Sequence, residues 1–326
     1  MKFRRNKPQA IATVAFNMRP ARGPWGGSST FVDQFSAYLQ YRGYRVTYAL
    51  RGRVDAIVLI DPRDDLENKT FGMDEIRAYK GQHPGCCVLH RVNECDLRKH
   101  SDFMDAALAA ASPVADHTVF ISQWLADYHA ERWFDTSRPH SVIYNGADPR
   151  IFHPFGASRY RQGETLRIVT HHWADSRIKG FDVYEALDGL LAEGSVRDVQ
   201  LVVCGRWPAD ITWRVAETHA PCHGATLARL LRSCHVYLTA SKHEPCGMHH
   251  VEGAQCGLPL LYHEDGGGIN EAGQRYGIGF RDHVGDAIET MRANYEAMRN
   301  KVLTEFPSGD RMCLDYANTL QRMLAC

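Results

Sequence analysis

Residues 239–259 read TASKHEPCGMHHVEGAQCGLP and follow a short apolar run at 236–238. The run predicts a buried strand, and residues 247–255 predict a helix that ends before the Gly-Leu-Pro of 257–259. A strand, a polar loop and a helix in direct succession are typical of an open parallel sheet, where ligands bind beyond the carboxyl ends of the strands. The segment therefore predicts both a Rossmann-like sheet and a binding loop.

The same alternation of apolar runs and amphipathic stretches extends over the chain on both sides of this segment. Strands are expected at 11–16, 44–49, 56–60, 86–89, 118–121 and 141–144, and again at 166–170, 199–204, 236–238 and 259–262. Helices are expected near 31–39, 74–80, 101–111 and 122–131, and near 182–191, 225–233, 247–255, 284–303 and 312–324. Strands and helices that alternate at this spacing predict parallel sheets covered on both faces.

Residues 145–149, NGADP, interrupt the pattern, and a polar, glycine-containing stretch follows at 155–164. We place the domain boundary there, between residues 1–150 and residues 151–326. The predicted fold is α/β, with two Rossmann-like domains whose parallel sheets face each other, and the last helix is free to return to the first domain.

The composition of the 326 residues, with 44% hydrophobic and 23% charged side chains, is that of a globular two-domain protein. The 38 basic residues equal the 38 acidic ones, so no overall charge favours nucleic acid as a partner. No apolar run reaches the roughly 18 residues of a transmembrane helix, and the start MKFRR precedes too short an apolar stretch for a signal peptide. The ten scattered cysteines favour reduced thiols. We expect a cytoplasmic protein; peripheral contact at the inner face of a membrane stays open, as does the oligomeric state.

The loop and helix within 239–259 suit a phosphate with sugars on either side. Glu244 ends the loop, and Glu252 lies about a turn and a half into the helix that begins near Gly247. The first N–H groups of that helix lack partners and form a positive dipole end, which favours a phosphate. Carboxylates beside a phosphate accept hydrogen bonds from sugar hydroxyls. The chemistry favours a nucleoside diphosphate sugar as ligand.

Several motifs resemble those of the family 4 retaining glycosyltransferases. The two glutamates separated by seven positions, Gly247, the Gly-Leu-Pro of 257–259 and GGGINE at 266–271 look like the family signature. Similar to other segments of the family are Gly26-Gly27 after the first strand, VFISQWL at 119–125, the linker IYNGAD at 143–148 with Phe152 and Pro154, and Lys179-Gly180. The resemblance covers most of the chain. It implies the GT-B fold, an acceptor-binding domain at 1–150 and a nucleotide-sugar donor-binding domain at 151–326.

The resemblance also implies roles for individual residues. Glu244 would contact hydroxyls of the donor sugar, Glu252 the ribose hydroxyls, and the backbone at Gly247 and Met248, with His249 beside them, the diphosphate. Lys179 would neutralise the phosphate as it leaves, a task that suits a compact ammonium. Gly26 and Gly27 would let the backbone approach a phosphate or the acceptor.

One position departs from the family. Five residues before Lys179 the family usually has an arginine, and this chain has Ala174. Arg177 and Arg206 are the candidates to replace it, with the alternative that both are plain surface arginines.

The segment His90–Lys99, HRVNECDLRK, directly follows the strand expected at 86–89. So many polar groups at the carboxyl end of a strand favour a binding site over a core. We expect His90, Asn93 and Asp96 to contact the acceptor and the donor sugar.

Two groups of histidine and cysteine, at 219–223 and 246–250, invite a metal hypothesis. Neither has the paired spacing of a closed zinc site. We therefore expect no metal and no cofactor other than the donor substrate.

The expected activity is transfer of a sugar from a nucleoside diphosphate sugar to an acceptor hydroxyl with retention of the anomeric configuration. The acceptor class, whether a glycan, a lipid-linked molecule or a small molecule, stays open. A nucleotide-sugar epimerase of the same architecture and a non-enzymatic two-domain sugar-binding protein are the alternatives; a sugar phosphorylase lacks a pyridoxal lysine segment here. A dehydrogenase is disfavoured because GPWGG, not Gly-x-Gly-x-x-Gly, follows the first strand.

Overall fold

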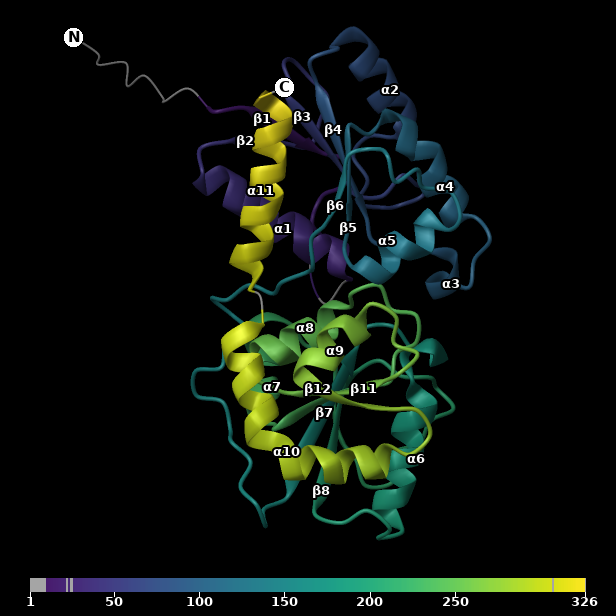
Figure 1. The fold of residues 1–326 in the computed structure, drawn as a ribbon, viewed down its shortest axis with the longest axis vertical. Helices are drawn as coiled ribbons and strands as arrows, with labels where there is room; N and C mark the ends of the chain where they lie inside the picture. Colours follow the sequence, from purple (N-terminus) through teal and green to yellow (C-terminus); the bar gives the residue numbers. More distant parts are fainter. Residues whose placement is uncertain (1–9, 22, 24–25, 307, 326) are drawn as a thin grey trace, which may run out of the picture.

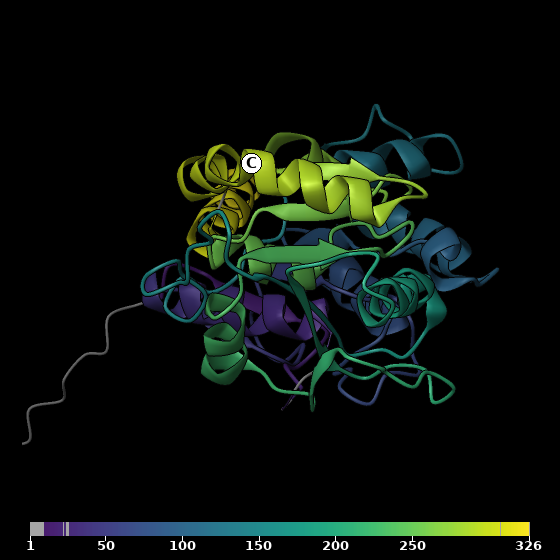
Figure 2. The ribbon, with the colours of Figure 1, turned by 90° about the horizontal axis from the view of Figure 1, so that it is seen from below.

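The computed structural model describes residues 10–21, 23, 26–306 and 308–325. The basic start of the chain and residues 24–25 of the glycine-containing segment lie outside the described residues. The described chain forms two lobes stacked end to end, with the N-terminal lobe above the C-terminal lobe in Figure 1. Viewed along the long axis, the C-terminal lobe lies in front of the N-terminal lobe (Figure 2).

The N-terminal lobe is built on a six-stranded sheet in the order β2-β1-β3-β4-β5-β6, in which every pairing is parallel. Its strands are β1 (Thr13–Phe16), β2 (Arg45–Thr47), β3 (Ala56–Leu59), β4 (Cys87–Val92), β5 (His117–Phe120) and β6 (His140–Val142). Its helices are α1 (Gly27–Tyr41), α2 (Met73–Gln82), α3 (Asp96–Lys99), α4 (Met104–Ala111), the 3-10 turn η1 (Ser112–Val114) and α5 (Gln123–Ala130).

The C-terminal lobe repeats the plan with a second parallel sheet, in the order β12-β11-β10-β7-β8-β9. Its strands are β7 (Leu166–His172), β8 (Val199–Gly205), β9 (Glu217–His219), β10 (Val236–Thr239), β11 (Leu260–His263) and β12 (Gly277–Phe280). Its helical segments are the 3-10 turn η2 (Arg177–Lys179), α6 (Phe181–Ala192), α7 (Gly224–Arg232), α8 (Met248–Gln255), α9 (Ile269–Tyr276) and α10 (Val284–Glu305). The expected α/β class with parallel sheets is confirmed.

Both faces of each sheet are covered by helices, because the central strands are apolar on both sides. In the C-terminal lobe, α6 and α10 pack on one face and α7, α8 and α9 on the other. In the N-terminal lobe, α2 covers one face and α1 the other, together with the last helix, α11 (Gly309–Ala325). The ring of Tyr316 in α11 lies 4.7 Å from that of Phe31 and 5.4 Å from that of Phe35. The last helix therefore completes the core of the first lobe.

The described chain also contains elements that the sequence pattern did not predict: the strands β9 and β12, the helices α3 and α9, and the 3-10 turns η1 and η2. It also extends β4 to Val92, past the expected end at residue 89, so that His90 and Arg91 lie inside the strand. Among the described residues, no helix combines the length and the apolar character needed to span a membrane.

Candidate functional site

Two helix N-termini meet where the lobes touch. Helix α8 of the C-terminal lobe begins after Gly247 and α1 of the N-terminal lobe begins after Gly26; neither has a side-chain cap or an acidic residue in its first turn. A Cβ on Gly27 would lie 2.9 Å from Cγ of Met248, so any larger residue there would require the Met248 side chain to move. Figure 1 shows α1 and α8 on opposite sides of the junction between the lobes. Two uncapped positive helix ends that face each other favour an anion between them.

Glu244 lies beside the N-terminus of α8 and is buried. Its loop is held by the glycine segment 266–268: the N–H of Glu244 donates to the carbonyl of Gly266 (3.1 Å), and the N–H of Gly268 donates to the carbonyl of Glu244 (3.0 Å). The preceding His243 has φ +51°, a left-handed conformation that is uncommon for a non-glycine residue. The loop is thus fixed from both sides, and it presents the Glu244 carboxylate to the opposite lobe.

The Glu244 carboxylate binds two cations through a single oxygen. Oε2 accepts hydrogen bonds from Nζ of Lys179 at 2.6 Å and from Nε of Arg98 at 3.1 Å. Burial alone would raise the pKa of Glu244, but Lys179 and Arg98 hold it well below its usual range. Burial lowers the pKa of Lys179, and the charge of Glu244 raises the pKa of Arg98. The carboxylate is ionised, and one cation from each lobe shares its negative charge.

The Lys179-Gly180 pair owes its position to close packing. Lys179 ends the 3-10 turn η2, and its side chain is 10% exposed. Gly180 has φ +84°, and a Cβ there would lie 2.3 Å from Cβ of Ala240, just beyond β10. Only glycine fits this position, and it brings Lys179 next to Glu244.

Arg98 was not among the residues expected in the site. It lies on α3, and the loop around it is organised by Asp96, whose carboxylate accepts hydrogen bonds from Ser101 Oγ (2.6 Å) and from the N–H groups of Met104 (2.8 Å) and Asp105 (3.2 Å). These bonds outweigh the effect of burial and lower the pKa of Asp96. The Asp96 carboxylate thus binds its own loop in this structure, and not a group that faces the opposite lobe.

Glu252, in α8, is also paired. Its Oε2 lies 2.9 Å from Nε2 of His171, at the end of β7, while the other ring nitrogen of His171 lies 3.1 Å from the hydroxyl of Tyr237. Glu252 is 7% exposed and His171 is fully buried. The sequence prediction did not include His171, although its place after a buried strand was a usable signal.

His249 does not point between the lobes. Its Nε2 lies 3.0 Å from the hydroxyl of Thr239, and its ring packs among those of His172 and Tyr237 beneath α8. Burial holds the pKa of His249 well below its usual range, so the ring is neutral. The expected donor contact of this residue is therefore limited to its backbone, whereas Met248 lies at the interface against Gly27.

His90 is in a different place from the one expected. It was assigned to a loop, but it lies in β4 with no exposed surface, and neither ring nitrogen has a hydrogen-bond partner. Burial lowers its pKa to about 4. Asn93, one residue beyond β4, is partly buried and donates from Nδ2 to the hydroxyl of Ser28 in the first turn of α1 (2.8 Å). Asn93 thus lies near the facing helix ends, and His90 lies in the core.

The two arginines considered as phosphate ligands have partners other than Lys179 and Glu244. Arg177 is half-exposed and forms ion pairs with Asp210 and Glu185. Arg206, at the carboxyl end of β8, is exposed and donates from Nη1 to the carbonyl of Trp173 (2.9 Å).

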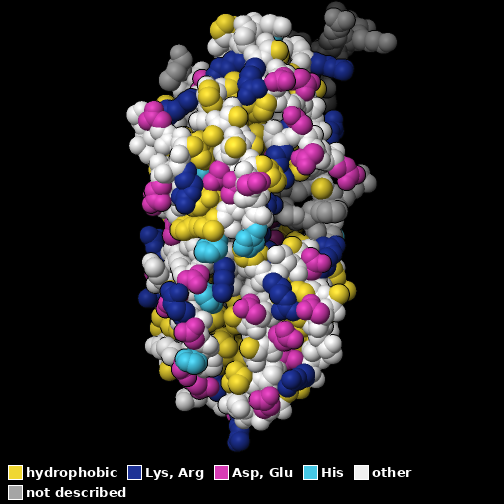
Figure 3. All heavy atoms as spheres, turned by 90° about the vertical axis from the view of Figure 1, so that its right-hand side faces the viewer, with side chains coloured by type: hydrophobic (Ala, Val, Ile, Leu, Met, Phe, Trp, Pro, Cys, Tyr) yellow, Lys and Arg dark blue, Asp and Glu magenta, His cyan; other side chains and the backbone are white. Residues whose placement is uncertain are grey.

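Polar contacts hold the lobes together beside this site. Glu271, in α9, accepts hydrogen bonds from the N–H groups of Gln123 and Trp124 (3.2 and 2.7 Å), so a side chain of one lobe caps α5 of the other. In the linker, Asn145 accepts from Nη2 of the buried Arg91 (2.9 Å) and donates to the carbonyl of Cys246 (2.7 Å). Figure 3 shows histidine and basic side chains at mid-height, where the lobes meet.

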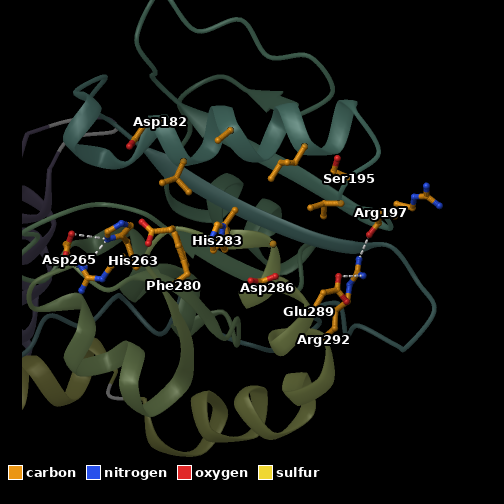
Figure 4. Close-up of a pocket in the computed structure, with 18 of the residues that line it drawn as sticks. Asp182, Ser195, Arg197, His263, Asp265, Phe280, His283, Asp286, Glu289 and Arg292 are labelled. Carbon is orange, nitrogen blue, oxygen red and sulfur yellow. Dashed lines mark hydrogen bonds and ion pairs between the residues drawn. The ribbon is translucent and has the colours of Figure 1, made fainter.

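Other clusters lie outside this site. A cavity of about 1080 Å³ opens between α6, the end of β12 and the start of α10; its lining includes Asp182, Asp265 and His283 (Figure 4). Among the described residues, no three histidine, cysteine, aspartate or glutamate side chains are grouped so that they could hold a metal ion. The described cysteines are free, and the sulfur atoms of Cys204 and Cys222 lie 3.6 Å apart.

Comparisons with known proteins give a match in structure alone. No family model matches the chain, and no curated protein matches it. Among solved structures, sucrose-phosphate synthase from Thermosynechococcus elongatus matches with a TM-score of 0.70 and 16% identity over 96% of this chain and 99% of that one. Anabaena HepE in complex with UDP matches with a TM-score of 0.70 and 13% identity over 96% and 100%. WaaG, a glycosyltransferase involved in lipopolysaccharide biosynthesis, matches with a TM-score of 0.63 and 13% identity over 94% and 99%.

These matches cover both lobes in one arrangement. The chain has the GT-B fold. In the GT-B arrangement seen here, the carboxyl end of β10, the N-terminus of α8 and the N-terminus of α1 lie at the interface between the lobes. The fold expected from the sequence is confirmed, and the Lys179–Glu244–Arg98 cluster lies at this GT-B interface.

Proposed function

We propose that the protein is a retaining glycosyltransferase that moves a sugar from a nucleoside diphosphate sugar to an acceptor hydroxyl. The observation that carries the proposal is the position of Lys179 and Glu244 beside the N-terminus of α8, opposite the N-terminus of α1. Uncapped helix ends and a buried ammonium favour a phosphate, and a buried carboxylate next to them suits sugar hydroxyls. The HepE structure contains UDP, which supports a uridine nucleotide as the first donor to test.

Each group then has a task in binding the donor. The N–H groups at Gly247 and Met248 hold the diphosphate, and those at Gly26 and Gly27 approach it from the other lobe. Glu252 accepts hydrogen bonds from the ribose hydroxyls after it releases His171. Glu244 turns from its cations to the hydroxyls of the donor sugar. Asn93, which lies near the start of α1, is placed to contact the acceptor or the sugar.

Transfer with retention requires attack on the same face from which the diphosphate departs. The bond between the anomeric carbon and the phosphate oxygen breaks, and its electron pair stays with the phosphate. The acceptor oxygen forms the new bond to that carbon, and its proton passes to the departing phosphate. Lys179 and the two helix ends stabilise the charge that develops on the phosphate, which is where preorganised positive groups contribute most.

Two measurements test the proposal. Thermal unfolding in the presence of UDP, ADP, GDP or dTDP should find a nucleoside diphosphate that binds, since a ligand at 100 times its dissociation constant stabilises the fold by about 2.7 kcal/mol. Proton NMR of the product formed from the matching α-linked sugar nucleotide should then show an α linkage. A β-linked product would contradict retention, and an altered donor without transfer would instead support an epimerase. Failure of every nucleotide to bind would contradict the proposal as a whole.

A further inference from the structure

The N-terminal lobe contributes a cation to the site. Arg98 comes from α3, whereas Lys179 and Glu244 come from the C-terminal lobe, yet all three meet at one carboxylate oxygen. The side chain of Arg98 is 15% exposed and those of Lys179 and Glu244 are 10% and 9% exposed. Arg98 is therefore part of the buried cluster, although it belongs to the opposite lobe.

The charges around Arg98 leave one more cation than anion. Besides Glu244, the carboxylate that faces it is that of Glu94, whose pKa is raised by burial and which pairs with Lys99 at 3.3 Å. If Glu244 turns to a sugar hydroxyl, Arg98 and Lys179 lose the oxygen that they share. Two nearly buried cations without an anion are costly, so a second anion must take that place.

We propose that Arg98 binds the diphosphate of the donor together with Lys179, and that Glu244 occupies the place of this anion while the site is empty. The inference rests on the proposed function and extends it by a catalytic residue from the N-terminal lobe. A guanidinium suits the task, because its donors reach two phosphate oxygens at once. Arg177 and Arg206, which are engaged with Asp210, Glu185 and the carbonyl of Trp173, are not needed for it.

The two cations come together on the diphosphate only when the lobes are closed. Because Lys179 and Arg98 belong to different lobes, the full positive charge on the diphosphate is assembled only when the lobes are together. A nucleotide bound to the C-terminal lobe alone meets Lys179 and the end of α8. The leaving group is stabilised fully only in the closed form, which ties departure of the diphosphate to exclusion of water.

The test compares a nucleoside diphosphate with its monophosphate, because the monophosphate lacks the second phosphate group of the diphosphate that Arg98 is proposed to bind. Calorimetry uses the tightest binder among UDP, ADP, GDP and dTDP, and the corresponding monophosphate. Arg98→Ala should lower the affinity for the diphosphate about 10- to 100-fold, because a charge-assisted hydrogen bond is lost. Its affinity for the monophosphate should change less than about threefold. Arg98→Lys, which keeps the charge, should recover most of the affinity. The turnover of Arg98→Ala should fall by more than its affinity, since charge on the phosphate is greatest in the transition state.

The control is Arg77→Ala, which removes one exposed positive charge from α2 in the same lobe. It should leave both affinities and the rate unchanged. Equal weakening of diphosphate and monophosphate by Arg98→Ala would show a disturbed loop and overturn the proposal, as would wild-type affinity for both. If the wild-type protein binds no nucleoside diphosphate, the proposed function fails together with this inference. If the wild-type protein binds the diphosphate and Arg98→Ala binds it equally well, only this inference fails.

Discussion

Replacement of Glu244 by alanine should strengthen the binding of a bare nucleoside diphosphate while it abolishes most of the sugar transfer. In the empty site, the diphosphate has to displace a carboxylate that accepts charge-assisted hydrogen bonds at 2.6 and 3.1 Å. In the variant this competitor is gone, and we expect about tenfold tighter binding, equal to about 1.4 kcal/mol. The donor sugar loses its partner, so transfer falls although the nucleotide binds well.

The same substitution should destabilise the empty protein. Removal of one partner of a buried ion pair costs about 3–5 kcal/mol, and the slight exposure of Arg98 and Lys179 places the cost at the lower end of this range. A nucleoside diphosphate should restore much of the loss. Glu244→Gln, which keeps the shape of the side chain and a weaker hydrogen-bond acceptor, is the matched control. Its free energy of unfolding should lie between those of the wild type and of Glu244→Ala.

Three measurements on the Glu244 variants check this reasoning: calorimetric affinity for UDP, urea unfolding with and without UDP, and the initial rate of transfer. If both variants bind the bare nucleotide more weakly than the wild type does, Glu244 is a direct ligand of the nucleotide. The idea that it takes the place of an anion is then wrong.

Four further outcomes are expected. Glu252→Ala should lower the calorimetric affinity for UDP about 10- to 100-fold and leave the affinity for pyrophosphate unchanged, because only UDP has ribose hydroxyls that can bind this carboxylate. Glu271→Ala should remove the cap that joins α9 to α5, and X-ray scattering should then show a larger radius of gyration. The free energy of unfolding should fall as the pH drops from 6.5 towards 4, because in this range His90, with its pKa lowered to about 4, is protonated only in the unfolded chain. Urea unfolding should show that this group contributes a loss of about 2 kcal/mol between pH 8 and pH 5. In the variant His90→Leu the dependence of the unfolding free energy on pH should be weaker. Transfer should continue in EDTA, since Lys179 and two helix ends supply positive charge, and complete loss restored by one divalent ion would show that a metal was overlooked.

The fold could be predicted because most strands are continuous apolar runs. The elements that escaped prediction are the ones whose local composition argues against them. Strand β12 has the sequence GIGF and α9 has INEAGQRY, so glycine and polar residues hide both from periodicity. The end of β4 was missed for a related reason: His90 and Arg91 are polar, yet Arg91 lies 4.3 Å from the ring centre of Phe31 and is bonded to Asn145. Tertiary contacts, rather than local preference, place these residues in a strand.

The positions of candidate-site residues were predictable where they follow from neighbours along the chain. Lys179 and Glu244 lie in the segments that follow β7 and β10, and Glu252 lies in the next helix, α8, as the sequence pattern indicated; their roles stay predictions. Arg98 contacts Glu244 across 146 positions, and His171 contacts Glu252 across 81. No local pattern in a single sequence encodes such pairs. His90 shows the opposite case, since a polar residue near a strand end looked accessible but is enclosed by the helices that cover the sheet.

The position of α11 has a consequence for synthesis on the ribosome. The N-terminal lobe requires Met312, Tyr316 and Leu320 to complete its core, whereas the sheet of the C-terminal lobe ends at Phe280. The last strand of the N-terminal sheet ends at Val142. At translation rates of roughly 5–20 residues per second, α11 is synthesised about 10 to 40 s later. The lobe made first is thus completed last. A circular permutant that starts with 309–325 would let the two lobes mature in the order in which they are made.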